Sequence, residues 1–136
     1  MMNQILVAED DEDDYSLLKD IFKKIYPQIN LIWVKDGEEL TELLFKSSNS
    51  KPACIILDLN MPKKDGRQAL AEIRAKKDLQ DIPIIVFTTS ASKADKLYVG
   101  EFGRTSFVTK PIGLSKYEDF VRSMVMIHLP ELQAYG

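Results

Sequence analysis

The sequence contains the stretch Cys54-Ile55-Ile56-Leu57-Asp58, in which four apolar residues lead directly into a carboxylate. A short run rich in β-branched residues is typical of a strand that is buried on both faces. Comparable runs occupy residues 5–8, 31–34, 84–87 and 107–108. Strands of this kind indicate a parallel sheet that is covered by helices on both sides.

Amphipathic stretches separate these runs. One helical stripe holds Leu17, Leu18, Ile21, Phe22 and Ile25, and a second holds Leu40, Leu43 and Leu44. Further helices are expected at residues 66–76, at 93–101 and from about 116 onward. The alternation predicts an α/β fold of the (βα)5 type: a doubly wound, parallel five-stranded sheet with the flavodoxin-like order 2-1-3-4-5.

Length and composition restrict the class of protein. The chain has 136 residues, 45% of them hydrophobic and 29% charged, which predicts one globular domain over residues 1–136, with a C-terminal helix and a short tail from about 116. A net charge of -3 disfavours nucleic-acid binding. Because we find neither a signal-like N-terminus nor a long apolar segment, we expect no membrane association and a cytoplasmic location. Cys54 is expected to be a packed core thiol, and residues 47–52 a surface connection.

Polar side chains follow four of the predicted strands, at the point where each strand ends. Glu9 and Asp10 follow the first, Asp58 the third, Thr88 the fourth and Lys110 the last. Since the carboxyl ends of parallel strands meet at one edge of a sheet, we expect these groups to lie together. Carboxylates gathered in this way repel one another unless a cation binds, and Mg²⁺ prefers oxygen ligands.

This set of groups suits phosphoryl transfer. The Asp58 carboxylate can act as a nucleophile when positive charge neutralises the transferred group. Lys110 would supply one such charge, and the Thr88 hydroxyl can donate a hydrogen bond to a phosphoryl oxygen.

Four segments, in order, resemble response-regulator receiver domains. They are ILVAEDD at 5–11, IILDLNMP at 55–62 followed by Asp65-Gly66, VFTTS at 86–90 and FVTKP at 107–111. The resemblance covers nearly the whole chain and extends to the short single-domain regulators associated with bacterial phytochromes and hybrid kinases.

The resemblance implies the following roles. Asp58 is the phosphoacceptor of a two-component phosphorelay. Asp10 and Asp58 bind Mg²⁺ directly, Glu9 binds it through water, and Asn60 contributes its backbone carbonyl.

A switch is implied as well. Thr88 and Phe107 correspond to its hydroxyl and its aromatic ring, and Lys110 corresponds to a lysine that precedes a cis proline, here Pro111. Residues 103–106 depart from the Gly-Ala that the family usually has before the last strand, so this loop is expected to differ in shape.

The implied function is that of a signalling protein. A histidine kinase or phosphotransfer protein would donate the phosphoryl group, and a downstream protein would dock to the phosphorylated form. The chain would catalyse only its own phosphorylation and dephosphorylation, so it is not expected to be an enzyme in the ordinary sense.

Two alternatives are disfavoured by the residues present. A flavin-binding module needs a Gly/Ser/Thr-rich phosphate cradle after the first strand, where this chain has Glu9-Asp10-Asp11. A phosphatase with an aspartate nucleophile would carry a second acid at the position of Asn60.

The remaining charged and aromatic residues receive simpler interpretations. Asp13 and Asp14 are expected to cap the first helix and to stabilise its N-terminus. Asp11 and Glu12 are assigned to the surface, Trp33 is expected to be a packing aromatic, and His128 is expected to have no catalytic role. Lys63 and Lys64 could contact a phosphodonor protein, although exposed loop lysines usually have no specific role.

The last helix is apolar on more than one face. Tyr117, Phe120, Val121, Met124, Val125 and His128 fill the stripe that packs on the sheet, whereas Met126, Ile127 and Leu129 lie outside it. An apolar surface of this kind is expected to be buried against another protein surface. We therefore expect a homodimer or a kinase-docking surface built around the helix at 93–101, the last strand and the helix from about 116.

Overall fold

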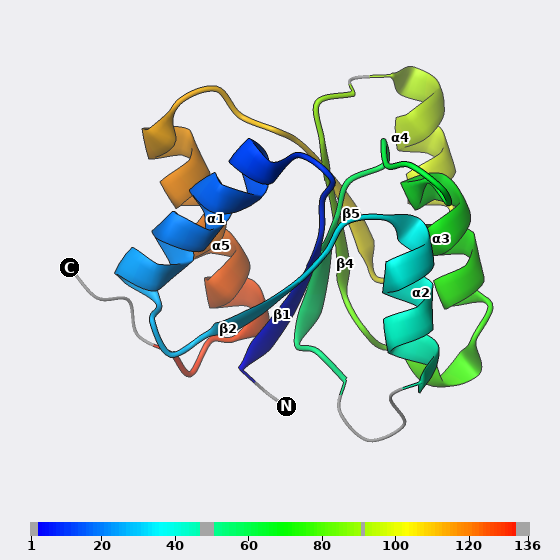
Figure 1. Cartoon of the computed structure of the whole chain (residues 1–136), viewed down its shortest axis with the longest axis horizontal. Helices are drawn as coiled ribbons and strands as arrows, with labels where there is room; N and C mark the ends of the chain where they lie inside the picture. The colour runs from blue at the N-terminus through cyan, green and yellow to red at the C-terminus, as the bar shows by residue number, and fades with distance from the viewer. Residues whose placement is uncertain (1–2, 47–50, 91, 133–136) are drawn as a thin grey trace.

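A parallel five-stranded sheet with the order β2-β1-β3-β4-β5 forms the centre of the structure, as the sequence predicts (Figure 1). The computed structural model describes residues 3–46, 51–90 and 92–132. The strands are β1 (Gln4–Ala8), β2 (Asn30–Val34), β3 (Cys54–Leu57), β4 (Ile84–Thr88) and β5 (Thr105–Thr109). The helices are α1 (Glu12–Ile25), α2 (Gly37–Lys46), α3 (Gly66–Arg74), α4 (Lys93–Gly100) and α5 (Leu114–His128), with a short 3-10 helix at Lys77–Leu79.

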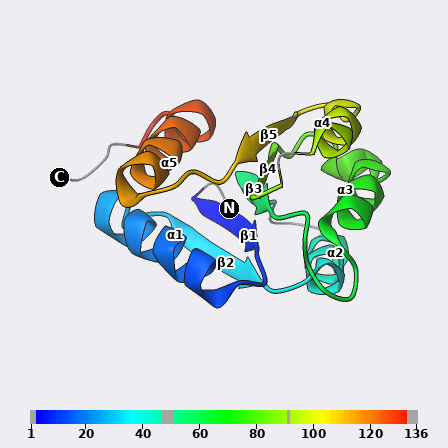
Figure 2. The same cartoon turned by 90° about the horizontal axis from the view of Figure 1, so that it is seen from above.

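The helices cover the two faces of the sheet unequally. Seen from above, α1 and α5 lie on one side, and α2, α3 and α4 lie on the other (Figure 2). Alternate residues of the inner strands supply the two cores: Ile5 and Val7 pack with α1 and α5, whereas Leu6 and Ala8 pack with α2 and α3. Both faces of these strands are therefore buried, which explains why residues 5–8, 54–57 and 84–87 are all apolar.

The two edge strands differ from the expectation of full burial. In β2 only Val34 is buried, and Phe107 and Val108 of β5 are half-buried. The reason is topological, because an edge strand has a neighbour on one side only. On α2, Leu43 is 37% exposed although its spacing predicted an inward position.

The C-terminal helix departs from the prediction at one residue. Met126 and Ile127 are each 70% exposed, as expected, but Leu129 is 3% exposed and belongs to the core beneath α1 and α5. Leu129 ends the helix with a non-helical backbone, and its side chain turns back to the core, where Leu132 also packs. The connection at 47–50 and the tail at 133–136 lie outside the described residues.

Cys54 is fully buried, and burial raises the pKa of its thiol to about 12, in keeping with a packed core residue. No helix in the described part of the chain is long and apolar enough to cross a membrane.

Candidate functional site

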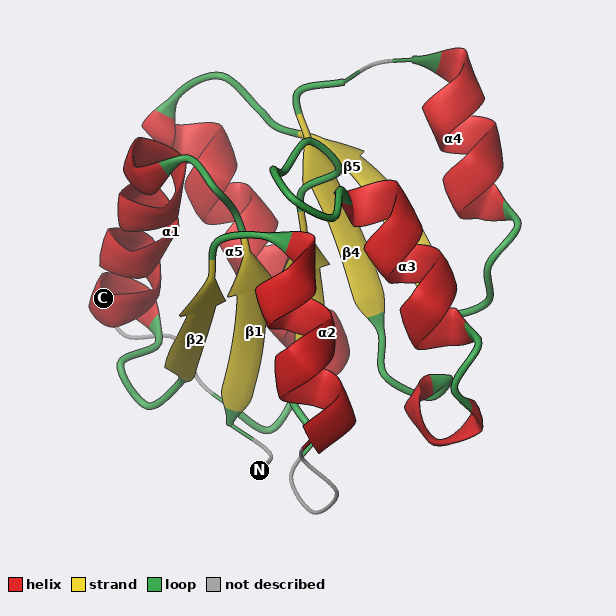
Figure 3. Cartoon of the chain, turned by 45° about the vertical axis from the view of Figure 1, so that its right-hand side comes forward, coloured by secondary structure: helices red, strands yellow, loops and turns green. Residues whose placement is uncertain are grey.

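The carboxyl ends of the strands point to one edge of the sheet, where the loops after them meet the N-terminal ends of the helices (Figure 3). Backbone hydrogen bonds hold this edge together: Asp58 donates to the Ala8 carbonyl at 3.0 Å, and Lys110 donates to the Thr88 carbonyl at 2.8 Å. The structure thus brings the polar ends of β1, β3, β4 and β5 into adjacent positions.

Three carboxylates form a group that can hold a cation. One oxygen from each of Glu9, Asp10 and Asp58 lies within 4.8 Å of the others, with Glu9 and Asp58 buried and Asp10 exposed. An all-oxygen set with one open side suits a hard divalent ion that keeps several waters. Burial raises the pKa of Glu9 to about 7, although the hydrogen bond from Lys110 acts in the opposite direction.

Lys110 lies at the centre of the site. Its side chain is 5% exposed, and its ammonium contacts Glu9 Oε1 at 2.7 Å, Asp14 Oδ2 at 2.7 Å and Asp58 Oδ2 at 3.1 Å. Burial alone would lower the pKa of Lys110, but hydrogen bonds to Asp14 and Glu9 outweigh burial and raise it above its usual value. The lysine therefore stays charged at neutral pH.

The loop after β3 is fixed around Asp58. The Asn60 backbone N–H donates to Asp58 Oδ1 at 3.2 Å, and the Gly66 N–H donates to the Leu59 carbonyl at 2.8 Å. A Cβ at Gly66 would collide with the Asp58 carbonyl oxygen, so the close approach of α3 requires glycine there.

The two residues assigned to a switch lie on neighbouring strands. Thr88 is fully buried, and its hydroxyl accepts a hydrogen bond from the Ser90 backbone at 3.3 Å. Phe107 pairs in register with Val86 on β4, and the Lys96 ammonium lies 5.9 Å from its ring centroid.

Two features at the two ends of β5 bear on the resemblance. The Lys110–Pro111 bond is trans, so the expected cis bond is wrong for this structure; trans is the ordinary form of an X–Pro bond and is favoured by about 0.5–1 kcal/mol. The loop over 103–106, which departs from the family pattern, contains Arg104 with φ 53.

The start of α1 is arranged differently from the prediction. Asp11, assigned to the surface, is the N-cap and accepts from the Asp14 backbone at 3.0 Å. Asp14, assigned to capping, instead directs its carboxylate to Lys110. The spacing in the sequence is the signal for this role, because Asp14 lies four residues, about one helical turn, beyond Asp10.

An ion pair that lies near the site was not predicted from the sequence. Arg67 of α3 holds Asp95 of α4 through two hydrogen bonds of 2.7 Å, and the Ser90 hydroxyl donates to the same carboxylate at 2.9 Å. These contacts join α3, α4 and the end of the Thr88 loop. Of the two loop lysines, Lys64 is engaged with Glu72 at 2.6 Å, whereas Lys63 is exposed, with Asp36 at 3.8 Å.

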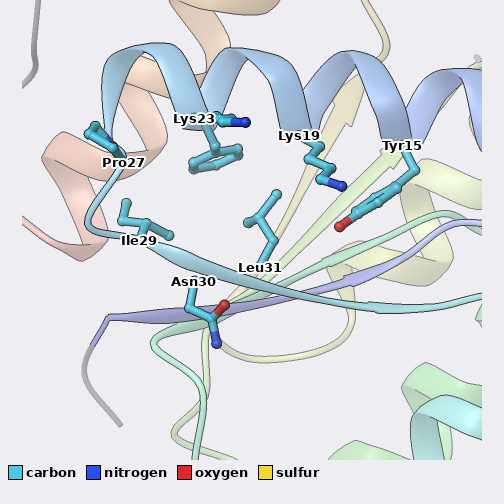
Figure 4. A pocket seen from close by; sticks show the side chains of 8 residues that line it. Tyr15, Lys19, Lys23, Pro27, Ile29, Asn30 and Leu31 are labelled. Carbon is cyan, nitrogen blue, oxygen red and sulfur yellow. The ribbon is translucent and has the colours of Figure 1, made fainter.

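A separate hollow lies between α1 and β2. It has a volume of about 200 Å³, and its lining residues include Tyr15, Lys19, Pro27 and Leu31 (Figure 4). Leu31 is near the start of β2, so this hollow extends toward the amino ends of the strands, whereas the carboxylates lie at the carboxyl ends.

Comparison with known proteins identifies the family. The model of the response regulator receiver domain matches residues 5–122. The response regulator Rcp1 of Synechocystis is 36% identical over 110 residues, which cover 78% of this chain and 75% of Rcp1.

Solved structures agree with this match. The phosphorylated cyanobacterial phytochrome response regulator RcpA superposes with a TM-score of 0.87 at 28% identity, over 100% of both chains. The Mn²⁺-bound form of Rcp1 has a TM-score of 0.84 at 31% identity, covering 98% of this chain and 99% of that one. The chain belongs to the response-regulator receiver family and is a two-component signalling protein.

Proposed function

We propose that this protein is a phosphorylation switch that accepts a phosphoryl group on Asp58. The observation that carries the proposal is the position of the Asp58 carboxylate, which is shared between the Glu9–Asp10–Asp58 group and the Lys110 ammonium. A nucleophile so placed faces positive charge on two sides once a cation is bound.

The transfer follows from this geometry. An Asp58 carboxylate oxygen attacks phosphorus, the bond from phosphorus to the donor nitrogen of a phosphohistidine breaks, and its electron pair stays on the imidazole. Lys110 donates hydrogen bonds to the charge that builds on the phosphoryl oxygens. Mg²⁺, held by Glu9, Asp10, Asp58 and the Asn60 carbonyl, would neutralise further charge. Hydrolysis of the acyl phosphate releases inorganic phosphate and restores the free Asp58 carboxylate.

The buried Thr88 hydroxyl and the half-buried Phe107 ring are proposed to transmit the change. A hydroxyl that leaves its contact with Ser90 for a phosphoryl oxygen vacates space, into which the ring on β5 can turn. The outer face of α4, β5 and α5 would then change shape and be recognised by a downstream partner.

The phosphodonor is proposed to be a histidine kinase or a phosphotransfer protein. The similarity to RcpA, a cyanobacterial phytochrome response regulator, supports a donor of the phytochrome-linked kind. Next to Lys110, Ile112 is 92% exposed and Leu114 is 55% exposed, which offers apolar contact beside the site. We further propose that residues 1–136 act as one receiver domain in the cytoplasm, catalysing only their own phosphorylation and dephosphorylation.

Labelling with a small acyl-phosphate donor tests this function. With Mg²⁺ present, intact-mass spectrometry should show one added HPO₃ group on the wild-type protein. Asp58→Asn should show none, because an amide is a poor nucleophile and cannot form the acyl phosphate. Removal of Mg²⁺ with a chelator should also prevent labelling. Equal labelling of wild type and Asp58→Asn would refute the assignment.

A second copy of the chain is proposed to cover the α4–β5–α5 face. Ile127 is 70% exposed and lines a hollow of about 450 Å³ beside the edge strand β5, together with His128, Ser106 and Pro83. Met126, the residue before it, is equally exposed. Exposed apolar side chains beside an unpaired strand edge favour association.

Light scattering over a concentration series tests the dimer. We expect the wild type to dimerise, more tightly with beryllofluoride as a phosphoryl mimic, and Ile127→Glu to remain monomeric, because a charge cannot be buried there without a partner. Lys116→Glu, an exposed change at the other end of α5, is the control. A wild-type protein that is monomeric at high concentration in both states would contradict the proposal.

A further inference from the structure

The three acceptors of the Lys110 ammonium differ in one respect. Glu9 and Asp58 belong to the group that can hold a cation, whereas Asp14, at 2.7 Å from the ammonium, does not. An ammonium has three donors, and all three are directed to carboxylates in this arrangement. Asp14 is thus the one acceptor, among the described contacts of Lys110, that a metal ion would not share.

We propose that Asp14 is a positioning residue that keeps the Lys110 ammonium beside Asp58 when a divalent cation binds Glu9 and Asp58. The proposal rests on the proposed function. A cation that draws electron density from Glu9 and Asp58 weakens the hold of both on the lysine and repels the ammonium itself. A carboxylate outside the metal group compensates for that loss.

The backbone of α1 makes Asp14 a fixed anchor. Its N–H is bound by the Asp11 side chain at 3.0 Å, so the first turn of the helix is capped. Its carboxylate is 34% exposed, whereas the lysine side chain that it reaches is 5% exposed. Asp13, the residue before it, is exposed and lies in the same first turn, but it makes no contact with Lys110.

Asp13 therefore provides a matched control. Asp13→Asn and Asp14→Asn remove the same charge from the same helix turn, so they have similar effects on the helix dipole. Of the two carboxylates, Asp14 is the one that contacts Lys110. Asp14→Glu keeps the charge and tests whether a carboxylate is what matters.

The first readout is the rate of phosphorylation from a small acyl-phosphate donor at saturating Mg²⁺ and saturating donor. Asp14→Asn should lower this maximal rate about tenfold, the effect usual for loss of a residue that orients a functional group. Asp13→Asn should leave it unchanged, and Asp14→Glu should recover much of it. The donor concentration for half-maximal rate should change little.

The second readout does not depend on activity. In nuclear magnetic resonance spectra of lysine-labelled protein, the Lys110 ammonium should give a slowly exchanging signal in the wild type with and without Mg²⁺. In Asp14→Asn, Mg²⁺ should weaken or remove that signal, because the ammonium is no longer held. Circular dichroism checks that each variant is folded.

The outcomes separate this inference from the proposed function. A wild type that does not label would refute the function itself. If the wild type labels and Asp14→Asn matches Asp13→Asn in rate and in the ammonium signal, the positioning role is refuted while the function stands. A faster Asp14→Asn would also overturn it, since Asp14 would then compete with Asp58 for the lysine.

Discussion

Lys110→Met is expected to slow phosphorylation of Asp58 by about a hundredfold or more, the usual effect of removing one donor that stabilises developing negative charge. The Lys110 ammonium is 3.1 Å from Asp58 Oδ2 and is buried, so water cannot replace it with equal effect. Stopped-flow or quenched labelling with the small donor measures the rate. Lys116→Met, an exposed lysine on α5, is the control and should behave as wild type.

The same substitution should reduce stability. Without the lysine, Glu9, Asp14 and Asp58 face one another without a cation, which typically costs about 3–5 kcal/mol for a broken buried ion pair. The folded-state pKa of Lys110 lies above its ordinary value, so its stabilising effect is fully present at neutral pH and is lost only as the pH rises beyond the unfolded-state pKa. Urea denaturation at pH 7 checks this, and added Mg²⁺ should restore part of the loss. A variant that unfolds and reacts like the wild type would exclude a central role for Lys110.

Asp10→Ala is expected to weaken Mg²⁺ binding by at least about a hundredfold, because it removes one carboxylate of the group formed by Glu9, Asp10 and Asp58. Asp13→Ala, in the same acidic run, should change it little, because Asp13 lies outside that group. Trp33 fluorescence is a suitable probe, since its indole N–H donates to the Glu9 carbonyl at 2.7 Å. Equal losses in both variants would mean that the acidic run binds cations diffusely.

The sequence predicted most of the fold because the inner strands are strongly constrained. β1, β3 and β4 are buried on both faces, so residues 5–8, 54–57 and 84–87 are apolar without interruption and mark the sheet. The edge strands β2 and β5 carry fewer buried residues, and β5, predicted at 107–108, extends over Thr105–Thr109. Leu129 could not be placed because the direction of the chain after α5, rather than helical spacing, determines its burial.

The candidate site was partly predictable for a related reason. Residues that directly follow a strand, such as Glu9, Asp58 and Lys110, are located by the strand itself. Asp14 and Asp11 are located by the start of α1, and a shift of the helix start by a residue or two exchanges capping and site roles. The Arg67–Asp95 pair depends on how α3 and α4 pack, which no local pattern in the sequence states.

The most direct measurement is reductive trapping of the phosphorylated residue. Borohydride reduces an aspartyl phosphate to homoserine, with loss of phosphate, whereas a free carboxylate is left unchanged. After labelling with the small donor and Mg²⁺, peptide mapping should find homoserine at position 58 and aspartate at positions 10 and 14. Homoserine at 10 or 14, or an unmodified Asp58 in fully labelled protein, would contradict the account.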